Sequence, residues 1–257
     1  MRQILFTGIL VLMLVIRSLA QTEVITDEDK LERKGFALFN AFYAYQVPGK
    51  DLALRFGNNS MIGGGFLYKF NSNLVAGLEG GFIFSENIKN KDSYLSKIST
   101  SEGYVISEAG TFAEVYLHER GFNINAKLGG ILPVIGPNSN SGILIMGGAG
   151  ILQHKIRYET PDNNAPQLSS KYKKGYDRLS NGPSISQFIG YVHFGNNKTI
   201  NFHIGAEFIQ AWTKSRRPFD FDRMQADTQK RFDLLWGIRV GWILPLYKRT
   251  AKEFYFY

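Results

Sequence analysis

The chain has 257 residues, no cysteine and a formal net charge of +8 at pH 7. Without cysteine it forms no disulfide and carries no lipoprotein anchor. Its mean hydropathy of −0.16 excludes a helical membrane protein. It does not exclude a membrane barrel of β-strands, in which a polar lumen and polar loops dilute the apolar signal.

The first 20 residues have the pattern of a secretory signal peptide. Arg2 supplies the positive start, Ile4 to Ile16 form an apolar run, and Ala20 ends a small-residue cleavage site. The alternative is a membrane anchor, but the run is shorter than the roughly 20 residues that span a bilayer. Residues 21–34 are charged and aperiodic, which predicts a flexible periplasmic lead. An exported, strand-rich chain argues against a nucleic-acid partner despite its basic charge.

Eight candidate strands follow: Gly35–Gln46, Ser60–Phe70, Leu74–Ser85, Thr111–Val134, Gly142–Glu159, Gly182–Gly195, Thr199–Thr213 and Arg231–Tyr247. Their connections alternate between short turns and long loops. In outer-membrane barrels the short turns are periplasmic and the long loops are extracellular. The sequence therefore predicts an all-β fold, an eight-stranded antiparallel up-and-down transmembrane barrel over residues 35–247, with both termini periplasmic. Residues 248–257 would form a short aromatic tail in the periplasm.

The segment Gly103–Val115 leaves the strand count open. It can form a hairpin over the turn Ser107–Gly110, and its second arm runs on into Phe122–Leu132. This pattern predicts a β-flap that projects beyond the membrane. The alternative is a separate pair of strands that turns at Glu119–Gly121 and gives ten strands, but ten strands would place long loops on both sides.

The closing stretch Lys230–Tyr247 shows the clearest period of two. Every second side chain from Leu234 to Leu246 is large and apolar, whereas Gly237, Arg239 and Gly241 lie between them. The same alternation in the other strands adds four ionisable residues to the inner face beside Arg239: Glu79, Lys127, His203 and Glu207. Because an eight-stranded barrel is just filled by side chains, these residues predict a charge network that plugs the lumen. A proton or ion path is the functional alternative.

Residues with catalytic chemistry are sparse. None of the four histidines has a Ser, Asp or second His at a spacing that suggests a site, and His154 is predicted to face the lipid. Asp220 and Asp222 form the nearest carboxylate pair and predict a solvated ion-pair cluster beside a basic run. The sequence therefore predicts no enzyme, no cofactor and no metal site.

The long loops carry basic residues interleaved with tyrosine. These residues are candidates for contact with a protein partner or with the phosphates of lipopolysaccharide and outer-membrane lipid. They are Lys171, Lys173, Lys174, Tyr176, Arg178, Arg216 and Arg217. A solvated loop without a partner is the alternative.

Several segments resemble a family of uncharacterised outer-membrane barrels of Bacteroidetes. They are Asn138–Gly142, Gln153–Arg157, Lys174–Arg178, Gly237–Pro245 and Phe254–Tyr257. The resemblance implies a bacterial outer-membrane location, and it implies kinship with barrels that assist type IX secretion and gliding. The sequence thus predicts a non-enzymatic barrel with a plugged lumen, which serves as a structural or protein-interaction component of the envelope, with accessory work for a secretion machinery as a further expectation. The alternatives are a lipid-modifying enzyme and a narrow-solute transporter.

Overall fold

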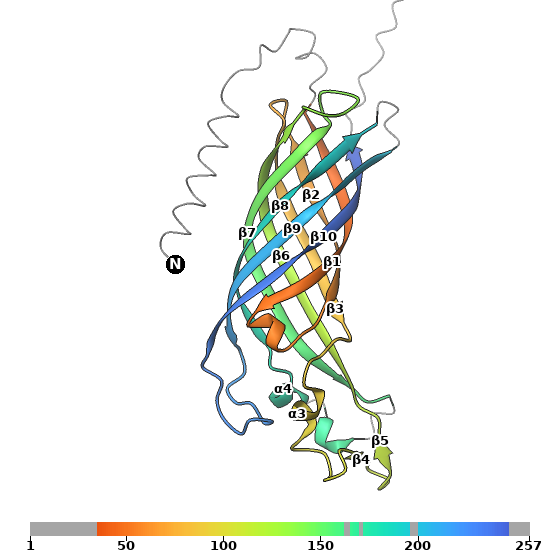
Figure 1. The fold of residues 1–257 in the computed structure, drawn as a ribbon, viewed down its shortest axis with the longest axis vertical. Helices are drawn as coiled ribbons and strands as arrows, with labels where there is room; N and C mark the ends of the chain where they lie inside the picture. Colours follow the sequence, from red (N-terminus) through yellow and green to blue (C-terminus); the bar gives the residue numbers. More distant parts are fainter. Residues whose placement is uncertain (1–34, 162–164, 170–171, 196–199, 247–257) are drawn as a thin grey trace, which may run out of the picture. The chain divides into compact units, whose positions relative to one another are not determined.

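The computed structural model describes residues 35–161, 165–169, 172–195 and 200–246. The predicted signal peptide (1–20), the predicted lead (21–34), Tyr247 and the predicted tail (248–257) lie outside them. The described chain forms a closed antiparallel barrel of eight strands (Figure 1). The strands are β1 (Phe36–Lys50), β2 (Asn59–Lys69), β3 (Leu74–Ser85), β6 (Tyr116–Leu132), β7 (Gly142–Glu159), β8 (Ser180–Phe194), β9 (Asn201–Ser215) and β10 (Lys230–Leu246).

The closure is made by β10, which pairs with β1 from Ala37 opposite Leu246 to Lys50 opposite Asp233. Each remaining strand pairs with its neighbour in chain order, except that β3 pairs directly with β6. The prediction of eight strands and an up-and-down barrel is confirmed.

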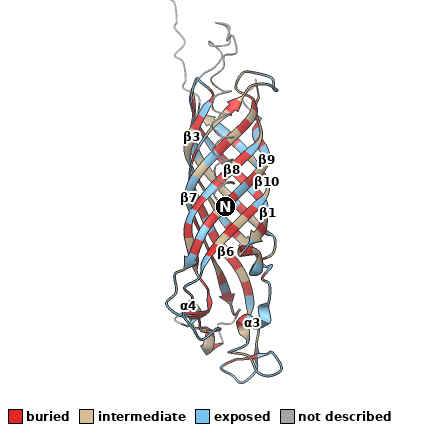
Figure 2. Cartoon of the chain, turned by 60° about the vertical axis from the view of Figure 1, so that its left-hand side comes forward, coloured by how far each residue is buried: buried red, intermediate tan, exposed pale blue. Residues whose placement is uncertain are grey.

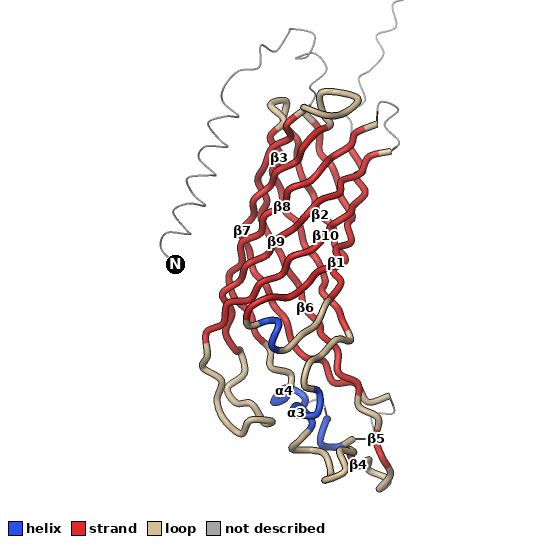
Figure 3. Tube along the Cα trace, in the orientation of Figure 1, coloured by secondary structure: helices blue, strands red, loops and turns tan. Residues whose placement is uncertain are grey.

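Short and long connections lie at opposite ends of the barrel, which we call the turn end and the loop end (Figures 1 and 3). The loop end carries η1 (Leu52–Leu54), α3 (Lys91–Leu95), β4 (Val105–Ile106), β5 (Phe112–Ala113), η2 (Pro166–Leu168) and α4 (Lys173–Tyr176). None of the described helices has the length and apolar character needed to span a membrane.

A small hairpin forms a sheet of its own, separate from the barrel sheet, where the flap was predicted. In it β4 pairs with β5, with Ile106 opposite Phe112. Gly110 has a φ of +76° and closes the turn, a conformation that favours glycine. The second arm does not run unbroken into β6, because Glu114 and Val115 are not in a strand. That part of the flap prediction is wrong.

The outer face of the barrel is apolar in its central part. On β10, Trp236, Ile238 and Trp242 are 47%, 65% and 53% exposed, while the alternate residues Arg239 and Ile243 are buried. Figure 2 shows the alternation of buried and exposed positions along the strands. So much exposed apolar surface is expected where a barrel faces lipid.

This polarity reverses near the loop end. The outer face of β7 is apolar up to Ile151 and continues with Gln153, Lys155 and Arg157, while Leu152 and Ile156 are buried inside. The sequence analysis placed His154, which alternates with these outer residues, on the lipid side, and the structure corrects that prediction. The physical reason is that β7 overruns the apolar belt: there its outer face is polar, and its inner face packs under the loops.

The barrel interior holds an apolar cluster at each end. At the turn end the cluster contains Phe36, Leu38, Leu67, Val75, Ile131, Leu144, Met146, Phe188, Val192, Phe194 and Ile243. At the loop end the inner faces of the strands pack against loop residues that include Leu52, Phe56, Ile88, Tyr94, Val105 and Leu168. Between the two clusters the interior is polar.

Candidate functional site

Arg239 is the centre of the polar layer between the two apolar clusters. Its Nη2 donates to Glu79 Oε1 at 2.7 Å, and its Nη1 donates to Glu79 Oε2 at 2.9 Å and to Glu207 Oε1 at 3.1 Å. Its guanidinium carbon lies 3.7 Å from the centroid of the Phe42 ring. The side chain is completely buried. Charge pairing and ring stacking together replace the water that a buried guanidinium loses.

The remaining partners balance the charge of this layer. Lys127 Nζ lies 3.1 Å from Glu207 Oε1 and 3.7 Å from Glu79 Oε2. Arg239 Nε donates to His203 Nε2 at 3.2 Å, so this nitrogen is unprotonated and the imidazole is neutral. Two cations therefore face two carboxylates, which is the condition for burying all four.

The structure brings together all five residues of the predicted lumen network, which come from β3, β6, β9 and β10. It also adds Asn40 of β1, whose Nδ2 donates to Glu79 Oε1 at 2.6 Å. The sequence analysis did not single out Asn40, although its position on the inner face of β1 follows from strand alternation.

A second buried polar cluster lies nearer the loop end, and the sequence analysis missed it. His154 Nε2 lies 2.9 Å from Asp233 Oδ2, and Thr213 donates its hydroxyl to the same oxygen. Glu119 accepts from Asn59 at 3.1 Å. The prediction that His154 faces lipid is wrong, because His154 lies on the inner face of the overrunning part of β7 and is 1% exposed.

This cluster does not have the arrangement of a nucleophile and its base. A catalytic triad places the imidazole between the carboxylate and the nucleophile. Here the carboxylate of Asp233 lies between His154 and Thr213, and all three side chains are buried. The Thr213 hydroxyl therefore hydrogen-bonds to the carboxylate and not to the imidazole, so the three side chains are not ordered as a catalytic triad.

The loop residues predicted to contact partners are divided by the structure. Lys174 and Arg216 are exposed, and Lys173 is half-buried. Tyr176 and Arg178 are buried, and Arg178 pairs with Asp222 and stacks on the Tyr94 ring at 4.4 Å. The expectation that these two contact a partner is therefore corrected, because both side chains, at the end of α4 and just after it, are buried within the loops.

Of the other two predicted loop residues, Arg217 forms an ion pair and Lys171 is not described. Arg217 donates from Nε to Asp177 Oδ1 at 2.8 Å, and this hydrogen bond raises the pKa of the guanidinium above its usual range. Lys171 lies outside the described residues. Arg217 thus belongs to an ion pair at the loop end.

The acidic pair of the last long loop is buried. Asp220 is completely buried and Asp222 is 7% exposed, so the prediction of a solvated cluster is wrong for both. Asp222 pairs with Arg178, whereas neither carboxylate oxygen of Asp220 has a hydrogen-bond partner in the structure. Within the described ranges, no group of three or more His, Asp or Glu side chains is placed to hold a metal ion.

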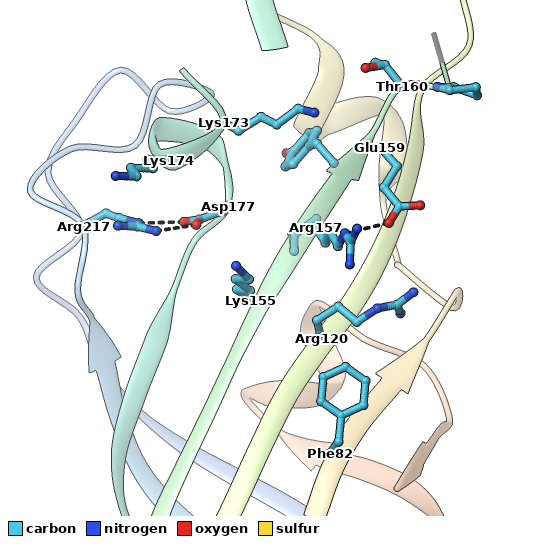
Figure 4. A pocket seen from close by; sticks show the side chains of 13 residues that line it. Phe82, Arg120, Lys155, Arg157, Glu159, Thr160, Lys173, Lys174, Asp177 and Arg217 are labelled. Carbon is cyan, nitrogen blue, oxygen red and sulfur yellow. Dashed lines mark hydrogen bonds and ion pairs between the residues drawn. The ribbon is translucent and has the colours of Figure 1, made fainter. Parts of the chain in front are cut away.

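A basic cleft of about 840 Å³ lies at the loop end, beside the outer surface of β7 (Figure 4). On the barrel side it is lined by Arg120, Lys155 and Arg157, and on the loop side by Lys173, Lys174 and Arg217. Glu159 and Asp177 are its acidic residues. The sequence analysis missed the three barrel residues because strand register, not sequence proximity, brings them together.

No family model matches the sequence, and no curated protein matches it. Among solved structures, Neisserial surface protein A has a TM-score of 0.41 at 10% identity, over 81% of this chain and 96% of that one. Ail, the attachment invasion locus protein of Yersinia pestis, has a TM-score of 0.38 at 11% identity, over 82% and 99%. The N-terminal β-barrel domain of Pseudomonas aeruginosa OprF has a TM-score of 0.36 at 13% identity, over 82% and 98%.

The closed sheet and its apolar outer face define the class of protein. The chain is a small β-barrel membrane protein of the outer-membrane type.

Proposed function

We propose that this protein is an integral barrel of the bacterial outer membrane with a closed bore, and that it is a structural or protein-interaction component of the cell envelope. The observation that carries the proposal is the burial of Arg239 between Glu79 and Glu207 at mid-barrel. A solute path through that layer would have to separate charges that compensate each other in a medium of low dielectric constant.

The two apolar clusters support a closed bore as well. A narrow-solute transporter needs a continuous polar path, but here the polar layer is enclosed by apolar side chains towards the turn end and under the loops. An eight-stranded barrel leaves little room beyond its own side chains. Filling the bore is therefore the role we assign to the network.

A role without catalysis is supported by the order of groups at His154, Asp233 and Thr213. A lipid-modifying enzyme needs an activated nucleophile or water within reach of its substrate. These three side chains are buried, so a lipid outside the barrel does not reach them, and the His154 imidazole contacts Asp233 and not the Thr213 hydroxyl.

We assign partner contact to the loop end, because long loops supply area and chemical variety that short turns lack. Exposed rings support this role: Tyr104 and Phe112 stack at 4.4 Å on the β4–β5 hairpin. Glu102, Glu108 and Glu114 give this hairpin an acidic character. Kinship with Bacteroidetes barrels and accessory work in secretion remain predictions.

Conductance across planar bilayers tests the closed bore. We expect negligible current from the purified, reconstituted protein, with a wide porin in the same bilayers as the positive control. Insertion is verified by heat-modifiable mobility on gels. Steady openings of porin size from the inserted protein would overturn the proposal and favour transport.

Replacement of Glu102–Ala109 by a short turn tests the interaction role. Barrel assembly should persist, because neither β4 nor β5 pairs with a barrel strand in the described sheets. Recovery of partners from native membranes should be lost. Recovery of the same partners by the shortened protein would show that the hairpin does not bind them.

A further inference from the structure

We propose that the basic cleft binds a phosphate group carried by a glycolipid of the outer leaflet, with the acyl chains of that lipid on the apolar barrel surface beside the cleft. This inference goes beyond the closed barrel of the proposed function. It rests on outer-membrane placement and is independent of whether the bore conducts.

The strand register of β6 and β7 brings basic side chains together on the outer face. Arg120 of β6 lies directly opposite Lys155 of β7, and both side chains lie on the outer face. Directly opposed residues of an antiparallel pair have Cβ atoms roughly 4.5–5.5 Å apart, and like charges at that separation destabilise the sheet. Arg157 lies two residues further along the same face of β7. A bound anion would convert this repulsion into attraction.

Several of the described basic side chains that line the cleft have hydrogen-bond donors free to bind an anion. In the described chain, the side chains of Lys155, Lys173 and Lys174 form no ion pair and donate no hydrogen bond. Among the described residues, the Arg120 guanidinium donates only to the adjacent carbonyl of Glu119, at 2.8 Å. Phosphate oxygens accept several such charge-assisted bonds at once.

The acidic residues of the cleft do not cancel this charge. Glu159 Oε1 pairs with Arg157 Nε at 2.6 Å, and Asp177 pairs with Arg217. Six basic and two acidic side chains line the cleft, so it keeps an excess of positive charge. Figure 4 shows Lys155 between the Arg217–Asp177 pair on one side and the Arg157–Glu159 pair on the other.

Apolar surface adjoins the charges of the cleft. This surface favours a lipid over a soluble anion as the ligand. Phe82 is part of the cleft lining and is 48% exposed. It lies opposite Phe122 in the sheet, two residues from Arg120 along β6. Ile124 and Ile151 continue the exposed apolar face towards the middle of the barrel. A phosphate bonded to a glycolipid has this same order, with charge directly next to acyl chains.

A second cross-strand pair of cations supplies a matched control. Lys214 of β9 lies opposite Lys230 of β10, and both are exposed. Neither residue lines the cleft. The opposed pair alone therefore does not define the site, which also needs the loop lysines facing it.

Lipid retention by the reconstituted full barrel tests the proposal. Arg120→Gln/Lys155→Gln is compared with Lys214→Gln/Lys230→Gln in nanodiscs that contain a bis-phosphorylated lipid A, and bound lipid is quantified by native mass spectrometry. We expect the cleft variant to bind about tenfold more weakly or worse, from the loss of charge-assisted hydrogen bonds. The control variant should stay within about twofold of the unmodified protein.

Two further arms separate the possible sources of the anion. Lipid A stripped of its phosphates should bind the unmodified protein as weakly as the cleft variant binds the intact lipid. Inorganic phosphate and a soluble phosphorylated glycan should not displace the lipid at millimolar concentration. Equal losses in both charge variants, retention of dephosphorylated lipid, or displacement by the soluble glycan would each overturn the proposal. Heat-modifiable mobility verifies that each variant has folded.

Discussion

Arg239 and Glu79 form a two-point ion pair across the barrel interior, with Nη2–Oε1 at 2.7 Å and Nη1–Oε2 at 2.9 Å. Arg239 is on β10 and Glu79 is on β3, and β1 and β2 separate these strands in the sheet. The pair therefore forms only when the whole barrel has closed. We expect this pair to contribute to the specificity of barrel closure more than to net stability.

Glu79→Gln should destabilise the barrel strongly. The substitution removes one of the two carboxylates that Arg239 and Lys127 share in the described structure, and removal of one partner from a buried pair costs about 3–5 kcal/mol. Urea unfolding in lipid vesicles, followed by tryptophan fluorescence, measures the effect on the free energy of unfolding.

Glu79→Gln combined with Lys127→Met is the matched comparison. It restores the balance between cations and carboxylates. The double variant should therefore lose less free energy of unfolding than the sum of the losses in the two single variants. Strict additivity would show that the charges of the network do not depend on one another.

The central barrel was predictable because one rule governs it. Between Leu234 and Leu246, lipid contacts one face of β10 and the packed interior contacts the other, so a period of two assigns each side chain. The same rule placed Glu79, Lys127 and Arg239 inside, and they lie there. Their exact partners depend on the tilt of strands around the barrel, which a local pattern does not contain.

The loop end was less predictable because its environment changes along a single strand. In β7 the outer face passes from Ile151 to Gln153 while the inner face stays apolar with Ile156. A parity assigned for lipid thus gives the reverse answer for His154. The change from apolar to polar residues after Ile151 was the available signal. The cleft residues Arg120 and Lys155 needed the pairing of β6 with β7 as well.

Gly237→Ala should impair closure of the barrel. A Cβ at Gly237 would lie 1.9 Å from the carbonyl oxygen of Tyr45, on the strand that β10 joins to close the sheet. Backbone does not yield to such a contact, so we expect a cost of about 1–3 kcal/mol. Gly147→Ala is the control, because the nearest atom to its Cβ is 4.0 Å away. Urea midpoints of the two variants measure the difference, and equal midpoints would contradict the prediction.

Asp220→Asn should protect the last long loop at neutral pH. Burial, followed by the charge of Asp227, raises the pKa of the Asp220 carboxyl above its ordinary value of 3.8. A raised folded-state pKa contributes stability that is present below 3.8 and is lost as pH rises through the folded value. At pH 7 the charged form therefore opposes folding of the loop, and the amide should slow tryptic cleavage after the exposed Arg223.

Asp227→Asn in the same loop should have the opposite effect. Burial acts to raise the pKa of Asp227, but the hydrogen bond and charge of Arg231 outweigh it and lower the pKa. The resulting stability is present above the ordinary value of 3.8 and is lost as pH falls through the folded value. At pH 7 this variant should be cleaved faster than the unmodified protein. Faster cleavage in both variants would contradict the prediction for Asp220, because it would show that both carboxylates stabilise the loop.

Ile238→Arg should report directly on contact with lipid. Ile238 lies on the outer face of β10 between Trp236 and Val240, within the apolar belt. Arginine on the lipid face near the middle of a bilayer costs roughly 2–4 kcal/mol, and the cost falls towards zero near the interface. Gln153→Arg is the control, because Gln153 lies beyond that belt on the outer face of β7. The free energy of unfolding in vesicles should fall for Ile238→Arg and stay within about 1 kcal/mol of the unmodified protein for Gln153→Arg.

In a detergent micelle, which deforms around a charge more easily than a bilayer, the difference in free energy of unfolding between the two variants should narrow. Equal stability of both variants in vesicles would mean that the face carrying Trp236, Ile238 and Trp242 does not contact the hydrocarbon core.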